Sequence, residues 1–256
     1  MKRFKELERK RYDKRGEIIL SNLKKKHIPL KNNSDNLPFI LHNQYKFYEK
    51  LILDNLESGM DVLEIGSGTG EFSGTAISTG ALVTLTDISE KSLEAAKYRF
   101  RKKKNFKVMV ADMEKLPFKE NKFDMVLSAG SLSYGNHEKV REEIFKVLKP
   151  NGYFICIDSL DHNPIYKINR LIHYLNGNRS WETISRIPKI KLIKDYKKFG
   201  LGNHYYFGSF IWLMNLLQKF ISGKKIVKIS EFIDRYFANH LTSFNFVMII
   251  KKGSLK

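Results

Sequence analysis

Apolar and polar positions follow one another in blocks along this chain, and the blocks predict strands and helices in turn. Short apolar runs are predicted strands, at 61–65, 81–86, 106–110, 123–128 and 153–157. Stretches with apolar residues at helical spacing lie around them, chiefly at 40–56, 89–101 and 137–148. This alternation predicts an α/β, Rossmann-like fold with a mostly parallel sheet and helices on both faces.

The two ends of the chain have a more helical pattern. Residues 1–25 are predicted to form a charged helix that is broken near Gly16, because glycine is a poor helix former. Beyond residue 158, helices are expected near 163–175, 190–199, 210–221 and 230–239, with strands near 203–207 and 243–250. We expect the parts around 160–186 and 208–240 to be helical insertions that cap the domain.

A turn with three glycines follows the first predicted strand, in the sequence Val62-Leu63-Glu64-Ile65-Gly66-Ser67-Gly68-Thr69-Gly70. Such a turn brings backbone close to an adenosine-type cofactor, since glycine adopts positive φ and has no Cβ between backbone and ligand. The spacing differs from the dinucleotide fingerprint G-x-G-x-x-G, because Glu71 stands where its last glycine would be. A carboxylate at Glu64 would repel a pyrophosphate and attract a cationic cofactor.

Further polar and small residues end the next predicted strands. Asp87 ends the second strand, where a carboxylate can reach the ribose hydroxyls of an adenosine cofactor. Asp112 ends the third, and we expect it to accept from the adenine amino group while Met113 covers the ring. Ser128 ends the fourth and leaves room for a ligand. The carboxyl ends of parallel strands share one edge of a sheet, so these residues predict one site.

The pattern E-x-G-x-G-x-G after a strand resembles motif I of the class I S-adenosylmethionine (SAM) methyltransferases. The similarity extends from Val62 to Asp158 and includes Leu148-Lys149-Pro150-Asn151-Gly152, in which Asn151 takes a place that is usually glycine. It implies a seven-stranded sheet with an antiparallel last strand, SAM as cofactor, S-adenosylhomocysteine as product, and Tyr12 folding over the bound cofactor. The expected cofactor-binding residues are Tyr12, Glu64, Gly66, Ser67, Gly68, Gly70, Asp87, Ile88, Asp112, Met113 and Ser128.

With this resemblance, the chain is predicted to be a single methyltransferase domain over 1–256. Within it, 1–58 would form N-terminal helices and a lid, 59–158 the SAM-binding core, and 159–256 the substrate cap with the final strands. The single cysteine, Cys156, lies in an apolar strand and is expected to be a core residue in a reducing cytoplasm. No Cys/His cluster predicts a metal site.

The formal charge of +19 raises the question of an anionic partner. Acids interrupt the basic cluster of the first segment, which is typical of a solvated helix, so we do not expect a nucleic-acid partner. The place after the fourth strand reads Ser128-Ala129-Gly130-Ser131, without the Asn/Asp-Pro-Pro-Tyr of nucleobase amino methylation. The prediction is a small-molecule, anionic acceptor; the sequence does not indicate the oligomeric state.

For the acceptor, the first hypothesis is a hydroxyl of a nucleotide-linked or phosphorylated sugar. The region after residue 160 resembles methyltransferases of bacterial surface-polysaccharide and capsule gene clusters. His162 is the candidate base, Tyr134 the candidate catalytic wall, and His137, Arg170 and Arg179 the candidate substrate contacts.

Three alternatives stay open. The apolar segment around 210–221, with lysines on both sides, suggests peripheral membrane contact and a lipid-like or quinone-type acceptor. An RNA acceptor rests on net charge alone. A non-catalytic SAM-binding partner protein is the third, because the motifs report binding and not chemistry.

Overall fold

The computed structural model describes residues 2–25, 37–176 and 180–253. Seven strands form one sheet in the order β3-β2-β1-β4-β5-β7-β6. Their bounds are β1 Asp61–Ile65, β2 Leu82–Asp87, β3 Phe106–Val110, β4 Phe123–Ala129, β5 Leu148–Ser159, β6 Gly200–Phe207 and β7 Asn245–Lys252. Strand β7 runs antiparallel to both β5 and β6 and the other pairs are parallel, which confirms the predicted fold class.

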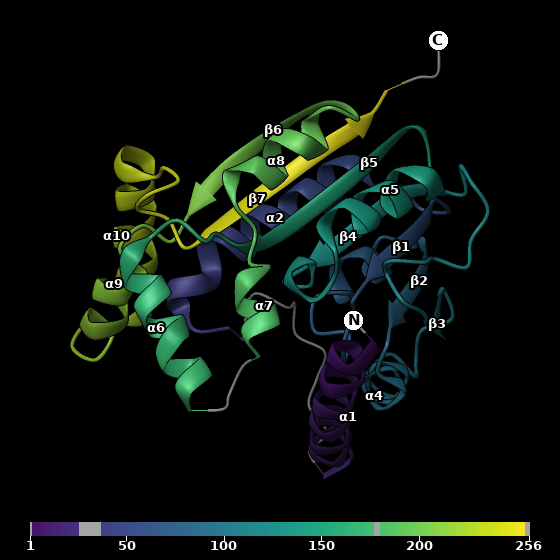
Figure 1. Cartoon of the computed structure of the whole chain (residues 1–256), viewed down its shortest axis with the longest axis horizontal. Coiled ribbons are helices and arrows are strands. Elements are labelled where there is room, and N and C mark those ends of the chain that lie inside the picture. The colour runs from purple at the N-terminus through teal and green to yellow at the C-terminus, as the bar shows by residue number, and fades with distance from the viewer. Residues whose placement is uncertain (1, 26–36, 177–179, 254–256) are drawn as a thin grey trace.

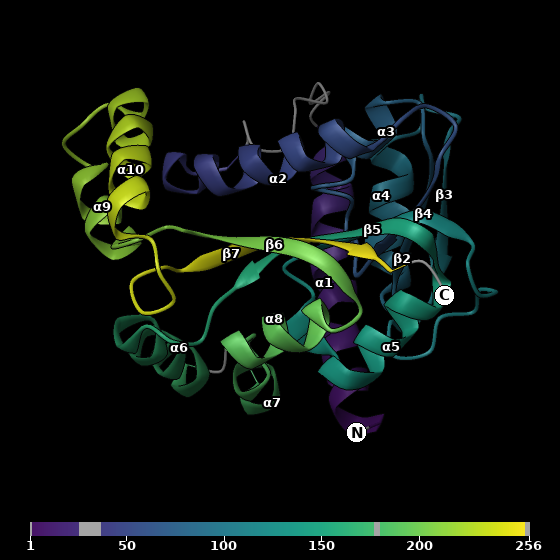
Figure 2. The ribbon, with the colours of Figure 1, turned by 90° about the horizontal axis from the view of Figure 1, so that it is seen from above.

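Helices cover both faces of the sheet (Figure 1). The longer ones are α1 Lys2–Lys25, α2 His42–Asn55, α4 Glu90–Arg99, α5 His137–Val147, α6 Pro164–Leu175, α8 Ile190–Lys197 and α10 Gly223–Phe237. The short ones are η2 Phe39–Leu41, α3 Gly74–Ser78, η3 Leu132–Tyr134, α7 Trp181–Ser185 and α9 Ile211–Leu217. Figure 2 shows α2 and α3 on one face and α5 and α8 on the other.

The core has two halves, one on each face of the sheet, because alternate residues of a strand point to opposite faces. Leu63 and Ile65 of β1 pack with Ile144 of α5 and Tyr196 of α8. The neighbouring Val62 packs on the other face, in the half that includes residues of α2, α3 and α4. The central strands are therefore buried on both sides, as their continuous apolar runs predicted.

Helix α1 is continuous, so the predicted break near Gly16 is wrong. A Cβ at position 16 would lie 2.5 Å from the backbone nitrogen of Ser92, at the start of α4. The glycine therefore serves close packing between α1 and α4 rather than a helix end. This packing places α1 beside α4 across the carboxyl ends of the parallel strands (Figure 1).

Candidate active site

A cavity of about 270 Å³ lies at the carboxyl edge of the parallel strands. Its walls come from the loops after β1, β2, β3 and β4, from α1 and from α2. Nine predicted site residues line it: Tyr12, Gly66, Ser67, Gly68, Asp87, Ile88, Asp112, Met113 and Tyr134. Residues from six separate segments thus meet where an open α/β sheet binds its ligand.

The three glycines of the turn all have left-handed φ, of +59° at Gly66, +53° at Gly68 and +72° at Gly70. Their surroundings differ. A Cβ at Gly68 would meet nothing within 4 Å, so this glycine opens into the cavity, whereas a Cβ at Gly66 would lie 2.4 Å from Ser131 and one at Gly70 2.7 Å from Phe100. Gly70 does not line the cavity, and its role is in packing on α4.

Asp87 is held at the end of β2 by two backbone donors. The N–H of Gly68 donates to its Oδ2 at 2.9 Å, and that of Ser89 to its Oδ1 at 2.8 Å. Burial raises the pKa of Asp87, while these N–H groups act in the opposite direction. The carboxylate is thereby fixed against the glycine turn, with a face on the cavity.

Glu64 lies behind the glycine turn and not on the cavity wall; its side chain is only 2% exposed. Burial raises the pKa of Glu64 to about 7, and the nearby charge of Asp87 acts in the same direction. Its Oε2 has no hydrogen-bond partner among the described residues. An unsatisfied buried carboxylate oxygen is destabilising by itself and would be favoured by a cation placed nearby.

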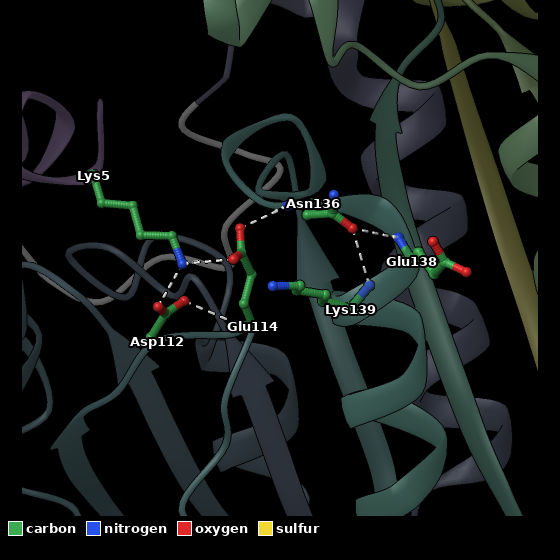
Figure 3. Close-up of polar contacts among 6 residues, drawn as sticks. All are labelled: Lys5, Asp112, Glu114, Asn136, Glu138 and Lys139. Carbon is green, nitrogen blue, oxygen red and sulfur yellow. Dashed lines mark hydrogen bonds and ion pairs between the residues drawn. The ribbon is translucent and has the colours of Figure 1, made fainter. Parts of the chain in front are cut away.

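Asp112 is linked to the N-terminal helix through a cation that the sequence analysis did not select. The Nζ of Lys5 on α1 contacts Asp112 at 2.5 Å and Glu114 at 2.8 Å (Figure 3). Glu114 in turn accepts from the backbone N–H of Asn136, and Asn136 caps α5 by accepting from the N–H groups of Glu138 and Lys139. This network connects α1, the loop after β3 and the start of α5.

Aromatic side chains form another part of the cavity wall. Tyr12 and Tyr134 meet edge to face with their ring centroids 5.4 Å apart. Tyr45 of α2 stacks on Phe72 of the loop after β1 at 4.5 Å. All four line the cavity, and burial raises the pKa values of Tyr12 and Tyr45, so both hydroxyls are neutral near pH 7. Tyr45 and Phe72 were missed, because nothing in their local sequence marks them.

Ser128 lies one layer below the wall. It is fully buried, and its hydroxyl hydrogen-bonds with that of Ser131 at 2.8 Å. Ser131, which does line the cavity, donates to the carbonyl of Ile65. The structure thus places Ser131, and not the predicted Ser128, where a ligand would touch it.

The predicted acceptor contacts lie elsewhere. The N–H of Ile190 donates to Nε2 of His162 at 3.0 Å, and burial together with neighbouring His240 lowers the pKa of His162. Arg170 is buried and donates to Asp161 and to the carbonyl of Leu160. Neither residue lines the cavity, because the loop after β5 turns away toward α8.

His137 lines a second cleft, between α5 and α8, and burial lowers its pKa. Arg179 lies outside the described residues. Within residues 2–25, 37–176 and 180–253, no three His, Cys, Asp or Glu side chains are grouped so that they could hold a metal ion.

Two comparisons of the sequence with known proteins find similarity to methyltransferases. A family model described as a methyltransferase domain matches residues 63–156. A demethylmenaquinone methyltransferase of Staphylococcus aureus (strain MRSA252) is 28% identical over 156 residues, which are 58% of this chain and 62% of that protein. The chain thus spans about 62% of the length of the curated relatives it matches.

Solved structures agree on the fold. The phosphoethanolamine N-methyltransferase 2 of Haemonchus contortus, in complex with SAM, has a TM-score of 0.60 at 20% identity, with 84% of this chain and 55% of that one covered. A geranyl diphosphate methyltransferase in complex with GPP and sinefungin has a TM-score of 0.58 at 17% identity, covering 82% and 76%. The fold is that of the class I SAM-dependent methyltransferases. Residues 63–156 match the methyltransferase-domain model, which agrees with the predicted enzyme class and cofactor.

The site residues fit SAM on three independent features. Gly68 and Gly130 leave open space that a Cβ would fill. Ser67 lines the same cavity, and its buried hydroxyl has no hydrogen-bond partner among the described residues. Carboxylates at the end of β2, Asp87, and just after β3, Asp112, line the same cavity.

Proposed function

We propose that this chain transfers a methyl group from SAM to a small molecule. The observation that carries the proposal is the shared cavity of the glycine turn, Asp87, Asp112 and the aromatic wall. When bound, SAM would supply a methyl group already activated on a sulfonium. The protein would then need to hold the acceptor in line and exclude water.

Within this cavity, Asp87 and Asp112 are proposed to hold the ribose and the adenine, with Met113 against the ring. Tyr12 covers the site from α1, as its place in the cavity wall and its contact with Tyr134 suggest. Glu8 fastens the same helix: it is buried, and its Oε1 accepts from the hydroxyls of Ser180 and Thr183 at the start of α7. Helices α1 and α7 would together keep water from the reacting methyl group.

For the acceptor, we propose an uncharged, ring-shaped molecule of quinone type. The aromatic wall suits a flat ring, since aromatic rings pack favourably edge to face or stacked with offset. The two cations that line the cavity are already paired, Lys5 with Asp112 and Glu114, and Arg15 with Glu71 at 3.4 Å. A phosphate would have to displace those carboxylates. The similarity to a demethylmenaquinone methyltransferase is consistent with this choice.

The sugar hydroxyl of a surface polysaccharide, our first hypothesis, has less support. Five residues were assigned to it. Tyr134 lines the cavity, but His162, His137 and Arg170 do not, and Arg179 lies outside the described residues. No observation on this chain favours RNA over a small acceptor. A non-catalytic SAM-binding protein would share the cofactor cavity, so it is distinguished by turnover alone.

The test begins with calorimetric titration of SAM and S-adenosylhomocysteine. Asp87→Asn should weaken binding at least about tenfold, since it removes a charge-assisted contact. The matched control is Asp54→Asn, an exposed carboxylate of α2 that pairs with Lys50. If Asp87→Asn and the wild type bound SAM with equal affinity, the proposed role of Asp87 in the cofactor site would be contradicted.

Transfer is then measured with isotope-labelled methyl from SAM. The acceptor panel contains a short-chain demethylated naphthoquinol, a nucleotide-linked sugar, a sugar phosphate and a generic RNA. We expect label in the naphthoquinol only. Label in a sugar would overturn the acceptor proposal and leave the methyltransferase proposal standing. Tight SAM binding without any transfer would favour the non-catalytic protein.

A further inference from the structure

Three helices gather at one end of the molecule and expose an unusual number of large apolar side chains. Helices α6, α9 and α10 all lie at this end in both views, with α9 and α10 on the side of α2 and α6 on the side of α8 (Figures 1 and 2). Helix α6 follows β5, α9 follows β6, and α10 precedes the antiparallel β7. All three therefore lie at the carboxyl edge of the parallel strands, the edge that also holds the cofactor cavity.

Helix α6 turns its apolar face to solvent. Its exposed apolar side chains, each between 44% and 72% exposed, are Ile165, Ile168, Leu171, Ile172 and Leu175. At about 100° per residue, they lie within an arc of about 120°. The residues that α6 buries against the protein, Tyr166 and Arg170, lie on the opposite side. An ordinary surface helix has the reverse arrangement, with its apolar face inward.

The other two helices at this end also expose large apolar side chains. Trp212 and Leu216 of α9 are four residues apart, so they share a side, and both are exposed. Phe220, just beyond the helix, is exposed as well. On α10, Phe232 and Tyr236 are also four apart, with ring centroids at 4.9 Å, and both are more than 60% exposed. Buried Ile226 and Ser230 occupy the side of α10 that packs on the protein.

Basic residues accompany the apolar ones. Between 211 and 237 the sequence has five basic residues and two acids. The basic residues, all exposed, are Lys219, Lys224, Lys225, Lys228 and Arg235. One of the acids, Asp234, is used internally, since it accepts from the N–H groups of Gly208 and Ser209. The outer surface is therefore apolar and positively charged at once.

We propose that α6, α9 and α10 form an interfacial surface that binds the headgroup region of an anionic phospholipid bilayer. Amphipathic helices with aromatic and aliphatic residues on one face and lysines beside them lie in this region of a membrane. The lysines would be attracted by anionic headgroups. No helix in the described part of the chain is long and apolar enough to cross a bilayer, which agrees with binding at the surface.

A second copy of this chain fits the surface less well than a bilayer does. In a symmetric dimer the same patch meets itself, so the lysines of the two copies would face one another. An anionic bilayer instead complements both the charge and the apolar side chains. This inference goes beyond the proposed methyl transfer and does not depend on it, because vesicle binding is measured without SAM.

The two tryptophans of the chain make a direct test possible, because Trp212 lies on α9 and the other, Trp181 of α7, can be replaced; both are exposed. In Trp181→Phe, emission reports on Trp212 alone. We expect a shift to shorter wavelength on addition of vesicles of phosphatidylcholine with phosphatidylglycerol, and quenching by brominated lipid. Neither change is expected with phosphatidylcholine alone at moderate salt, since the anionic headgroups supply the attraction.

Flotation with the same vesicles tests the residues. Ile168→Ser with Leu171→Ser, and separately Lys224→Gln with Lys225→Gln, should each reduce binding about tenfold or more. The matched controls are Leu53→Ser on α2 and Lys103→Gln with Lys104→Gln, whose side chains are equally exposed but lie elsewhere. Exposed positions tolerate such changes, and circular dichroism checks the fold.

Two outcomes would overturn the proposal. One is absence of flotation and of any emission shift at low salt. The other is a dimer of the wild type that sedimentation equilibrium no longer finds in the α6 variant, while vesicle binding of that variant is unchanged. This result would assign the surface to a second copy of the chain.

Discussion

Glu64→Gln is the substitution for which the structure predicts opposite effects on stability and on binding. The Glu64 carboxyl has an ordinary pKa of 4.5, and burial raises it to about 7 in the folded protein. The protonated form is therefore favoured in the folded state. The penalty for ionising Glu64 is absent below pH 4.5, grows as pH rises to about 7, and is constant above that.

The magnitude follows from these two values. A tenfold change in an equilibrium corresponds to about 1.4 kcal/mol, so at pH 8 the ionised Glu64 destabilises the fold by about 3 kcal/mol. At pH 5 the same calculation gives about 1 kcal/mol. Glutamine keeps the shape and cannot ionise. Glu64→Gln should therefore be more stable than wild type at pH 8, and much closer to it at pH 5.

Urea unfolding at the two pH values measures this difference, with Asp54→Asn as the control for loss of one carboxylate. Calorimetry measures the effect on binding. A cationic ligand favours ionised Glu64, so the affinity of the wild type for SAM should fall as the pH drops below 7. In Glu64→Gln the affinity should be weaker and nearly independent of pH. A stability difference that is equal at pH 5 and pH 8 would refute the reasoning.

Three further predictions concern helix α1. Gly16→Ala should lower the free energy of unfolding, measured in urea, by about 1–3 kcal/mol, because its Cβ would clash with the backbone at Ser92. Lys14→Ala, at a neighbouring position of α1, is the control. An unchanged free energy of unfolding in Gly16→Ala would contradict the close packing of α1 on α4. Lys5→Ala should raise the KM for SAM several-fold with little change in kcat, since Lys5 holds Asp112; a fall in kcat alone would argue against this role. Hydrogen exchange in α1 should slow on addition of S-adenosylhomocysteine, because Tyr12 lines the cavity; unchanged exchange would mean that α1 is not part of a lid.

The sheet was predictable because its strands coincide with short apolar runs that can be recognised in the local sequence. Strands β1 and β3 have the predicted bounds. The errors fall where tertiary contacts override local preference. Gly16 lies inside a helix because a neighbouring backbone approaches it, and α10 begins at Gly223 rather than near 230.

The cofactor side of the cavity was predictable for a related reason. Residues that end consecutive parallel strands must meet at one edge, so their places along the sequence fix their places in space. The cavity walls that helices and the far part of the loop after β1 contribute follow no such rule. Lys5, Tyr45 and Phe72 come from helices and a loop whose approach depends on the whole fold, while His162, close to a strand end in sequence, is held by α8.

The two ends of the carboxyl edge therefore carry different chemistry, and the difference bears on how the protein would work. Near β1 to β3, carboxylates, backbone N–H groups and aromatic side chains surround the cavity. Beyond β5, helices α6, α9 and α10 expose apolar and basic side chains. An apolar, ring-shaped acceptor dissolves poorly in water, so an enzyme that methylates it gains from holding its acceptor-binding edge at a lipid surface. The membrane-binding surface and the quinone-type acceptor are separate proposals with separate tests, but they are physically consistent, because a protein bound at a membrane is close to an apolar acceptor.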